Sequence, residues 1–509
     1  MFIKIVSGHA KLINIVDKMI QKILTSIILT QILLATVNGQ DFKNLDFQQK
    51  CDSSKTGLCY WDLSWGSKNS ASPTLFETKN TLLIEGENEN SVGFVEQSIS
   101  PPGINGVQIL SISSIIKSDS VIGKGAGLNI GLYDNDGTLI ANKDMGGFYS
   151  IDWIKGTNDW KKYTISIVVP SETKTIKIGM ILYGMGKVCY SDVNAKLTSI
   201  EGRKPSKLAD QYITAALDTI AKNSLVRDSI ISVSLKETAL KIAGPAVKYS
   251  DCFLAINFLL ESLRPFGDHH SFFMSAREVK NWESEGSQVS EIEFPSFKVF
   301  DSIGYILVPP FHGGNPKQMT AYADSMQSAI EKLYNSKIKG WIVDLRQNTG
   351  GNMEPMIAGL GPLFSSEKLG ALIDVNGISN SWYYKDGRYY GDDYKGWTVL
   401  KPFKPSSDLP IAVLIGNQTG SSGEIVTISF IGNSNTKSFG QPTWGLTTGN
   451  GSFELKDGSQ IFLASTVMSD RNGKLYTTSI TPDYMIEDFL TTENDEVIDA
   501  AKTWIMKKK

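Results

Sequence analysis

Cysteine and histidine, the common ligands of zinc, are scarce in this chain. It has four cysteines and four histidines in 509 residues. They form no CxxC pair, no HExxH motif and no mixed Cys/His spacing of the kind that holds zinc. The sequence therefore lacks the common zinc-site motifs, and we expect neither a metal nor a cofactor.

An excess of charge of one sign is also missing. Lys and Arg number 50 against 53 Asp and Glu, and no Lys/Arg block or alternation of aromatic and basic residues occurs. Because a nucleic-acid-binding surface needs such a basic patch, we expect no nucleic-acid partner. The length exceeds that of one hydrophobic core, and the usual ~150 residues per domain predict about three domains.

One apolar run, from Ile23 to Val37, lies near the N-terminus and is followed by small residues. A membrane-spanning helix needs ~20 strongly apolar residues, so this run is too short for one. It predicts instead a signal peptide that starts at Met19 and is cleaved after Gly39. Residues 1–39 would then be removed, and the mature protein would be exported to the periplasm, the cell surface or the medium.

The few cysteines have two possible fates. Cys51 and Cys59 bracket the turn-rich sequence DSSKTGL, and a disulfide between them would close one loop, which export permits. The alternative is that all four cysteines are free thiols in apolar surroundings. We expect this state for Cys252, within DCFLAINFLL.

Residues 40–200 have the alternation of a β protein. YTISIVVP (163–170) and IKIGMILYG (176–184) are period-two runs, separated from their neighbours by Gly, Asn and Asp clusters. Almost no helical periodicity occurs in this part of the chain. The pattern predicts an all-β sandwich.

Within this sandwich, GTNDWKKYTISI followed by IGMILYGMGKVCYSDV is similar to jelly-roll domains of the carbohydrate-binding-module type. The resemblance implies glycan binding on an exposed aromatic platform. The tryptophans available for it are Trp61, Trp65, Trp153 and Trp160. Packing of most of these rings in the core is the alternative, and a role as a spacer or a protein-binding module is also open.

Residues 207–275 follow a polar boundary and have apolar residues at helical spacing, which predicts a helical subdomain. The segment leads into GDHHSFF, where two of the four histidines are adjacent. Imidazole titrates near neutral pH and suits a general base, so His269 and His270 are candidates. The alternative is a pair of loop histidines without a chemical role.

Residues 276–509 alternate between strand and helix and predict a layered α/β domain. GYILVPPF (304–311), GWIVDLRQNTGG (340–351) and PIAVLIGN (410–417) are its expected strands. Ser421 follows the last of them, at the first turn of a helix. Free N–H groups and the helix dipole favour a developing negative charge there. An ordinary helix cap is the alternative role for this serine.

Five motifs, GYILVPPF, GWIVDLRQNTGG, TGSSGE, GQPTWG and TPDYMIED, have the order found in tail-specific, or C-terminal-processing, serine proteases. The chain resembles that family over roughly residues 207–490. The resemblance implies a crotonase-like α/β fold and hydrolysis of peptide bonds through a serine acyl-enzyme. It places the nucleophile at Ser421 and the oxyanion donors at the backbone N–H groups of Ser422, Gly350 and Gly351.

The chain departs from the serine–lysine branch of that family. Leu446 stands where a lysine would follow the PTFG-like motif, and leucine cannot accept a proton. The chain is similar instead to the branch of tricorn protease, in which a histidine from the upstream helical part is the base. This likeness implies that His270 is the base, in contact with Ser421, and that His269 is its neighbour.

The group that orients the imidazole is not evident from the motifs. The tricorn-like branch has a glutamate before its GxxPD-like motif, whereas this chain has KLYTTSITPD. The supporting candidates are Glu424, Asp470 and, within PTWG, Thr443. Of these, Glu424 has an alternative role in fixing the turn at the serine.

The predicted substrate is a peptide or an unfolded protein segment. The stretch 274–302 is too short for a PDZ module, so we do not expect recognition of a C-terminal tail by that means. Residues 364–406, rich in Tyr and Gly, predict either a lid over the cleft or a solvent-exposed hairpin. The sequence thus predicts an exported serine peptidase, and the alternative is a catalytically inactive binding protein with a protease fold.

Overall fold

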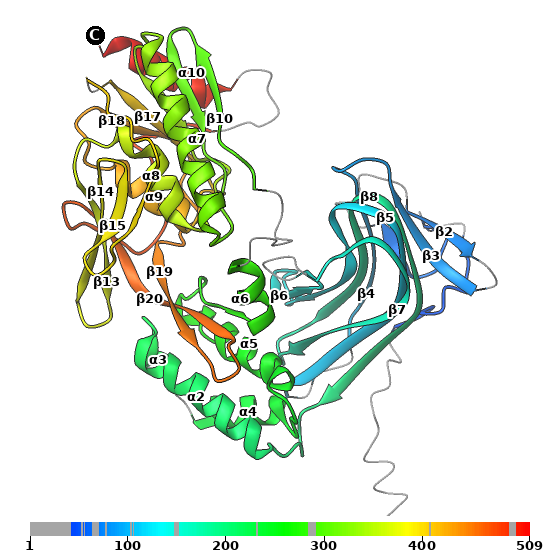
Figure 1. Cartoon of the computed structure of the whole chain (residues 1–509). Helices are drawn as coiled ribbons and strands as arrows, with labels where there is room; N and C mark the ends of the chain where they lie inside the picture. The colour runs from blue at the N-terminus through cyan, green and yellow to red at the C-terminus, as the bar shows by residue number, and fades with distance from the viewer. Residues whose placement is uncertain are drawn as a thin grey trace, which may run out of the picture. The chain divides into compact units, whose positions relative to one another are not determined.

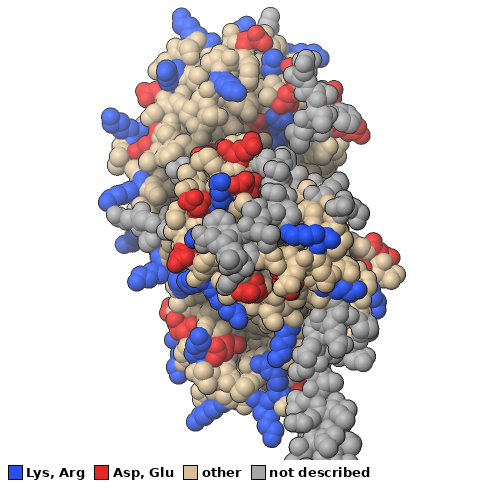
Figure 2. Space-filling model, turned by 90° about the vertical axis from the view of Figure 1, so that its right-hand side faces the viewer, with Lys and Arg blue, Asp and Glu red and all other residues tan. Residues whose placement is uncertain are grey.

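The computed structural model describes residues 42–508, except 52–53, 55, 64–70, 77–78, 102–103, 105, 147–151, 231–232, 284–291, 407–408 and 488–494. The described chain forms two compact units, one ending at Glu201 and the other beginning at Gly202 (Figure 1). The expected signal region and its cleavage point lie outside the described residues. On the face drawn in Figure 2, Lys and Arg are interspersed with Asp and Glu.

The first unit is built from β-strands around two long ones, β5 (Gln108–Tyr133) and β8 (Thr175–Ser199), which pair along most of their length. The shorter strands pair with them or extend the sheet: β1 Asp62–Leu63, β2 Ala71–Phe76, β3 Lys79–Gly86, β4 Val92–Ile99, β6 Leu139–Asp144 and β7 Ile154–Val169. The early part of β5 pairs with β7 and its later part with β6. Period-two burial along β4 and β7 reflects one face packed on the core.

The four tryptophans of the first unit were expected either to form an exposed platform or to pack in the core. Trp61 and Trp153 are 0% and 5% exposed, so both rings are buried, as the core-packing alternative expected. Trp160 is half-buried, and Trp65 lies outside the described residues. Two of the four tryptophans are therefore unavailable as an exposed platform.

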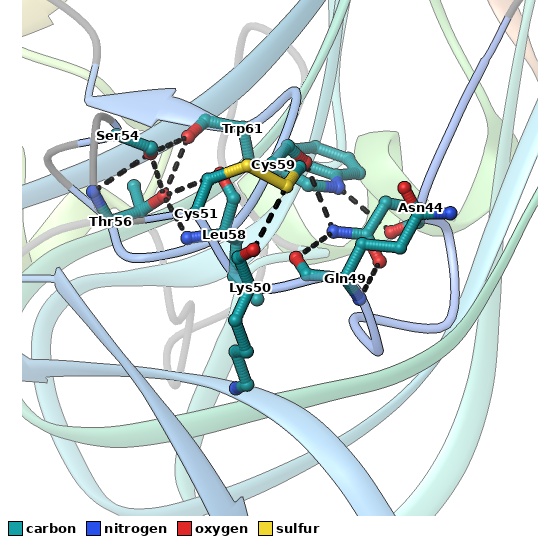
Figure 3. The surroundings of a disulfide bond; sticks show 9 residues. All are labelled: Asn44, Gln49, Lys50, Cys51, Ser54, Thr56, Leu58, Cys59 and Trp61. Carbon is teal, nitrogen blue, oxygen red and sulfur yellow. Dashed lines mark hydrogen bonds between the residues drawn. A yellow bond between two sulfur atoms is a disulfide. The ribbon is translucent and has the colours of Figure 1, made fainter.

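Cys51 and Cys59 form a disulfide, which was one of the two predicted alternatives. Figure 3 shows the surroundings of this bond. The Trp61 indole N–H donates to the Asn44 carbonyl over 3.0 Å, and the Asn44 amide donates to the Cys59 carbonyl over 3.0 Å. The bridge therefore holds a loop that is already anchored on a buried tryptophan. Cys189 and Cys252 are free and buried.

The second unit begins with helices, in agreement with the helical periodicity of residues 207–275. They are α2 Lys207–Asn223, α3 Arg227–Ile230, α4 Val233–Ala243, η1 Tyr249–Cys252, α5 Phe253–Glu261 and η2 Arg264–Phe266. The Ser206 hydroxyl caps α2 by accepting from the Ala209 N–H over 3.1 Å. Apolar residues of α2 at spacings of three and four, such as Ala209, Ile213 and Ala216, are buried.

A six-stranded, mainly parallel sheet follows. Its strands, in order across the sheet, are β10 Ser296–Phe300, β11 Ile303–Leu307, β12 Trp341–Asp344, β17 Ile411–Ile415, β18 Thr436–Gly440 and β22 Tyr484–Met485. Only β10 and β11 pair antiparallel. One face packs with helices α7 Pro316–Asn335, α8 Met353–Leu360 and α9 Ser422–Phe430, whereas α10 Glu496–Lys507 packs on the other. The predicted strand and helix alternation is therefore present.

A second sheet in this unit has the strands β16 Trp397–Thr398, β15 Arg388–Gly391, β14 Ser379–Lys385, β13 Lys368–Asp374, β20 Gln460–Asp470 and β19 Thr448–Glu454, in that order. Two short strands, β9 (Phe272–Met274) and β21 (Leu475–Tyr476), also pair with β20. Helix α6 (Ala276–Glu283) follows β9 directly. The end of the predicted helical subdomain is thus part of a sheet with β20.

The tyrosine-rich segment 364–406 is neither a lid nor a solvent-exposed hairpin. It supplies β13 to β16 of the second sheet, and its Trp382, Tyr384 and Tyr389 lie in the main hydrophobic core. Burial of these large rings explains its aromatic content. Within the described ranges, none of the helices has the length and hydrophobicity of a membrane-spanning segment.

Candidate active site

Ser421 lies in a turn between the buried strand β17 and the helix α9. Its backbone has φ 51° and ψ −117°. Residues other than glycine rarely adopt this combination, which costs on the order of 1–3 kcal/mol. Two bonds tie the turn to the chain after β12: the Thr419 hydroxyl donates to the Leu345 carbonyl over 2.8 Å, and the Gly420 N–H donates to the Asn348 carbonyl over 3.0 Å. The surrounding structure therefore fixes a strained serine at the N-terminus of a helix.

Glu424 holds the backbone of this serine. Its Oε2 accepts from the Ser421 N–H over 2.9 Å, and its Oε1 accepts from the Thr443 hydroxyl over 2.5 Å and from the Gly445 N–H over 2.9 Å. The side chain is fully buried, and burial raises the pKa of its carboxyl group. These bonds leave Glu424 as a capping-box residue that sets the turn, which was its alternative role, and not as a partner of His270.

His270 meets Ser421 although 151 positions separate them. The imidazole Nε2 lies 2.9 Å from Ser421 Oγ, and Nδ1 lies 2.8 Å from Thr448 Oγ1. The predicted contact between the histidine and the serine is therefore present. With its proton on Nδ1, the ring can donate to Thr448 and accept from the Ser421 hydroxyl, as a general base must.

The electrostatic surroundings keep this imidazole neutral. Burial lowers the pKa of His270 to about 4, and the charge of Asp268 and a hydrogen bond to Thr448 oppose this decrease only in part. An unperturbed histidine has a pKa of about 6.5. At neutral pH the ring is therefore neutral, with one N–H donor and one acceptor nitrogen.

The loop that bears His270 is held by hydrogen bonds to Asp268, a residue of the same loop, and by hydrogen bonds to the second sheet. Asp268 Oδ1 accepts from the backbone N–H groups of His270 and Ser271 over 3.1 and 2.9 Å. The Ala464 N–H donates to the Ser271 hydroxyl over 2.8 Å, and the Asn450 amide donates to the His270 carbonyl over 3.0 Å. The position of the imidazole thus depends on β19 and β20.

Two supporting candidates do not reach the imidazole. His269 is exposed and has no hydrogen-bond partner among the described residues. Asp470 accepts from the Asn472 and Lys474 N–H groups over 2.8 and 3.1 Å and from the Tyr476 hydroxyl over 3.1 Å, which shapes the hairpin after β20. Its assignment as the orienting acid is therefore wrong.

Thr443 supports the turn at the serine through Glu424. Its hydroxyl donates to the Glu424 carboxylate and accepts from the Ile480 N–H over 2.7 Å. Thr448, which the sequence analysis did not name, occupies the place beside Nδ1 where an acid was expected.

The glycine turn lies against the serine. Gly350 and Gly351 have φ angles of +108° and +104°, and a Cβ added at Gly350 would lie 2.8 Å from Ser421 Cβ. Only glycine fits at this approach. The turn is further tied to α9 by the Ser422 hydroxyl, which donates to the Gly351 carbonyl over 2.6 Å.

The expected oxyanion donors are only partly free. The Gly350 N–H donates to Asn348 Oδ1 over 3.0 Å, so this N–H is already engaged. The N–H groups of Gly351 and Ser422 donate to no other group within the part of the chain that the structure describes. Of the three predicted donors, these two could bind an oxyanion.

Comparison of the chain with known proteins identifies its family. The family model described as "Peptidase family S41" matches residues 302–486. The nisin-resistance protein of Lactococcus lactis subsp. lactis is 30% identical over 266 residues, which is 52% of this chain and 79% of that protein. The chain belongs to peptidase family S41. The family suggests a serine protease and implies a peptide or protein substrate.

Two other proteins are also similar to parts of this chain. The carboxy-terminal processing protease CtpA of Bacillus subtilis (strain 168) is 28% identical over 166 residues, 32% of this chain and 30% of that protein. A solved structure of a lipoprotein from Streptococcus agalactiae is 24% identical, covers 59% of this chain and 97% of that chain, and has a TM-score of 0.47.

Within the described part of this S41 chain, no lysine forms a hydrogen bond with Ser421. Leu446 lies close to Gly420, because a Cβ added at that glycine would be 3.7 Å from Leu446 Cδ1. Lys437 forms an ion pair with Asp483 over 2.8 Å, and Lys456 is exposed, as expected for surface charges. No group of three or more His, Cys, Asp or Glu side chains among the described residues is placed to hold a metal ion.

Two positioning residues were missed. Asn348 comes just before the glycine turn, and an Asn at this place often bonds to the backbone two residues on, so the local sequence held a signal. Its Oδ1 does accept from Gly350, and its amide donates to the Val308 carbonyl over 3.0 Å. Thr448 had no local signal, because its partner His270 is 178 positions away.

Proposed function

We propose that the protein is an exported serine peptidase that hydrolyses peptide bonds through an acyl-enzyme on Ser421, with His270 as the general base. The observation that carries this proposal is the 2.9 Å distance between His270 Nε2 and Ser421 Oγ. We further propose that the chain belongs to the tricorn-like branch of the S41 family, and the contact of Ser421 with a histidine from upstream of the α/β sheet supports this assignment.

The first half-reaction forms the acyl-enzyme. His270 Nε2 takes the hydroxyl proton as Ser421 Oγ attacks the carbonyl carbon of the scissile bond. The N–H groups of Gly351 and Ser422 bind the oxyanion that forms. When the tetrahedral intermediate collapses, the C–N bond breaks and His270 gives its proton to the leaving amine.

The second half-reaction frees the enzyme. Water attacks the Ser421 ester, His270 takes the proton of the water, and the same two N–H groups bind the second oxyanion. Collapse of this intermediate breaks the ester bond, returns the proton to Ser421 Oγ and releases the carboxylic acid. Thr448 holds the imidazole in place through Nδ1, where serine proteases with a triad have a carboxylate.

The remaining parts of the proposal concern the whole chain. Residues 1–39 are the signal region, residues 40–200 an accessory sandwich of the jelly-roll type, residues 207–275 a helical subdomain and residues 276–509 a crotonase-like catalytic domain. The sandwich would localise the enzyme, and a bound glycan is one means of doing so. The antiparallel pairing of β5 with β6, β7 and β8 supports an all-β accessory domain.

A catalytically inactive binding protein is the second candidate. The observation that favours it is the bond from His270 Nδ1 to a threonine hydroxyl, because a hydroxyl stabilises an imidazolium less than a carboxylate does. Against it stands the joint presence of the strained serine, the two free N–H groups and a neutral imidazole.

A fluorophosphonate probe tests the proposal. We expect labelling of the wild type, and loss of labelling in Ser421→Ala and in His270→Ala. His269→Ala is the matched control, because this neighbouring histidine is exposed and unbonded, and it should be labelled like the wild type. No labelling of a folded wild type, or equal labelling of His270→Ala, would exclude the peptidase proposal.

A further inference from the structure

An exposed tryptophan lies beside the candidate nucleophile. Trp444 is 56% exposed, whereas Trp341 and Trp382 of the same unit are buried at 2% exposure. An exposed ring of this size offers a large apolar surface that a ligand can cover. The position of this ring therefore points to a binding role.

The backbone around Trp444 is fixed through the same residue that fixes Ser421. The Trp444 N–H donates to the Thr419 carbonyl over 2.8 Å. Its neighbours Thr443 and Gly445 both donate to Glu424, whose other carboxylate oxygen accepts from the Ser421 N–H. The exposed indole is thus anchored on the frame of the nucleophile and not on a free loop.

The indole lies in contact with the residue that precedes the nucleophile. A Cβ added at Gly420 would lie 3.4 Å from Trp444 Cε3 and 3.7 Å from Leu446 Cδ1. Two apolar side chains therefore flank Gly420 within van der Waals distance, and Leu446 is half-buried. Because Gly420 directly precedes Ser421, this apolar surface adjoins the turn that bears the candidate nucleophile.

We propose that Trp444 and Leu446 form an apolar subsite that binds a large apolar or aromatic side chain of the peptide substrate, next to the scissile bond. This inference rests on the proposed function, since it assigns a specificity to that site. Ring-on-ring or ring-on-aliphatic contact with the exposed indole would supply the selectivity. The lysine position of the serine–lysine branch has here become part of a recognition surface.

Binding in the absence of catalysis tests the subsite. The Ser421→Ala protein is incubated with a pool of random synthetic decapeptides, and the retained peptides are identified by mass spectrometry. We expect enrichment of Phe, Trp and Leu, with a loss on the order of tenfold when Trp444→Ala is added. Trp444→Phe should keep the enrichment. Ile378→Ala, which removes a 65% exposed apolar side chain from the β13–β14 hairpin, is the matched control and should also keep it.

The outcomes separate the two proposals. An unchanged enrichment in Trp444→Ala, or no retained peptides with Trp444 intact, overturns the subsite. Labelling by the fluorophosphonate probe reports on the serine chemistry alone, and the control variant Ile378→Ala should be labelled at the wild-type rate. A wild type that selects apolar peptides through Trp444 but is not labelled would retain the subsite and exclude the peptidase.

Discussion

The turn that bears the serine and the loop that bears the histidine are built in different ways. Ser421 is fixed by a residue three positions away in its own helix, because Glu424 accepts its N–H. His270 is fixed by Thr448 and Asn450, which lie 178 and 180 positions further along the chain. The backbone of the candidate nucleophile is therefore held in part by its own helix, whereas the imidazole of the candidate base depends on a correctly folded second sheet.

Loss of Glu424 should have the largest effect. In Glu424→Ala, the buried donors from Ser421, Thr443 and Gly445 lose their acceptor, and each buried unsatisfied group costs about 1–3 kcal/mol. We expect the free energy of unfolding to fall by about 3 kcal/mol or more and probe labelling to be lost. Chemical denaturation and labelling measure the two effects. A stable variant that keeps its labelling would show that the turn does not depend on this carboxylate.

Gly350→Ala should reduce activity without comparable loss of stability. The added Cβ would lie 2.8 Å from Ser421 Cβ and 3.0 Å from the Ser422 nitrogen, so the nucleophile or an oxyanion donor has to move. A displacement of about 1 Å can cost on the order of a hundredfold in rate. The control is Gly377→Ala, which has a similar positive φ of +79° but no atom within 4 Å of the added Cβ. Equal labelling rates in the two variants would contradict this account.

Thr448→Val acts on the histidine side alone. The variant keeps the shape of the side chain but removes the hydroxyl that lies 2.8 Å from His270 Nδ1. We expect a decrease of about tenfold or more in the labelling rate, because the imidazole loses the group that orients it. Thr448→Ser should restore most of the rate. Failure of serine to rescue the rate would mean that the methyl group, through packing, was the important part.

The pH dependence should show the smallest effect, and it concerns the same imidazole. With a pKa of about 4, the His270 ring is neutral, and can act as a base, only above that pH. The labelling rate should therefore rise with pH through about 4 and then level off. Between about 4 and 6.5 the unfolded chain binds more protons at this site than the folded chain, so this contribution to stability falls as the pH falls. A rate that rises near 6.5 instead would contradict the burial of the ring.

The sequence was most informative where the structure is local. The period-two runs, the helix from Lys207 and the strand before Ser421 are present because each is specified by its own residues. Pairing of His270 with Ser421 was predicted only through the order of motifs in a family. Within one sequence, nothing local indicates that two such distant residues meet.

The errors in the site have one physical cause. Asp470 and Glu424 were considered as the orienting acid because they are carboxylates near the right motifs, but each is occupied by neighbouring backbone N–H groups. A turn or a helix N-terminus satisfies a nearby carboxylate before a distant imidazole can. Thr448 was overlooked since a threonine at the start of a strand is ordinary in sequence.

Strand β9 determines how the protein can be divided. It begins two residues after His270 and pairs with β20. The segment that bears His270 is therefore joined to the second sheet by backbone pairing. A fragment cut to the region 302–486 would retain Ser421 and both free N–H groups but would lack its proton acceptor. Such a fragment should therefore not react with the fluorophosphonate probe, and the missing segment added in trans should restore labelling only if β9 pairs with β20 again.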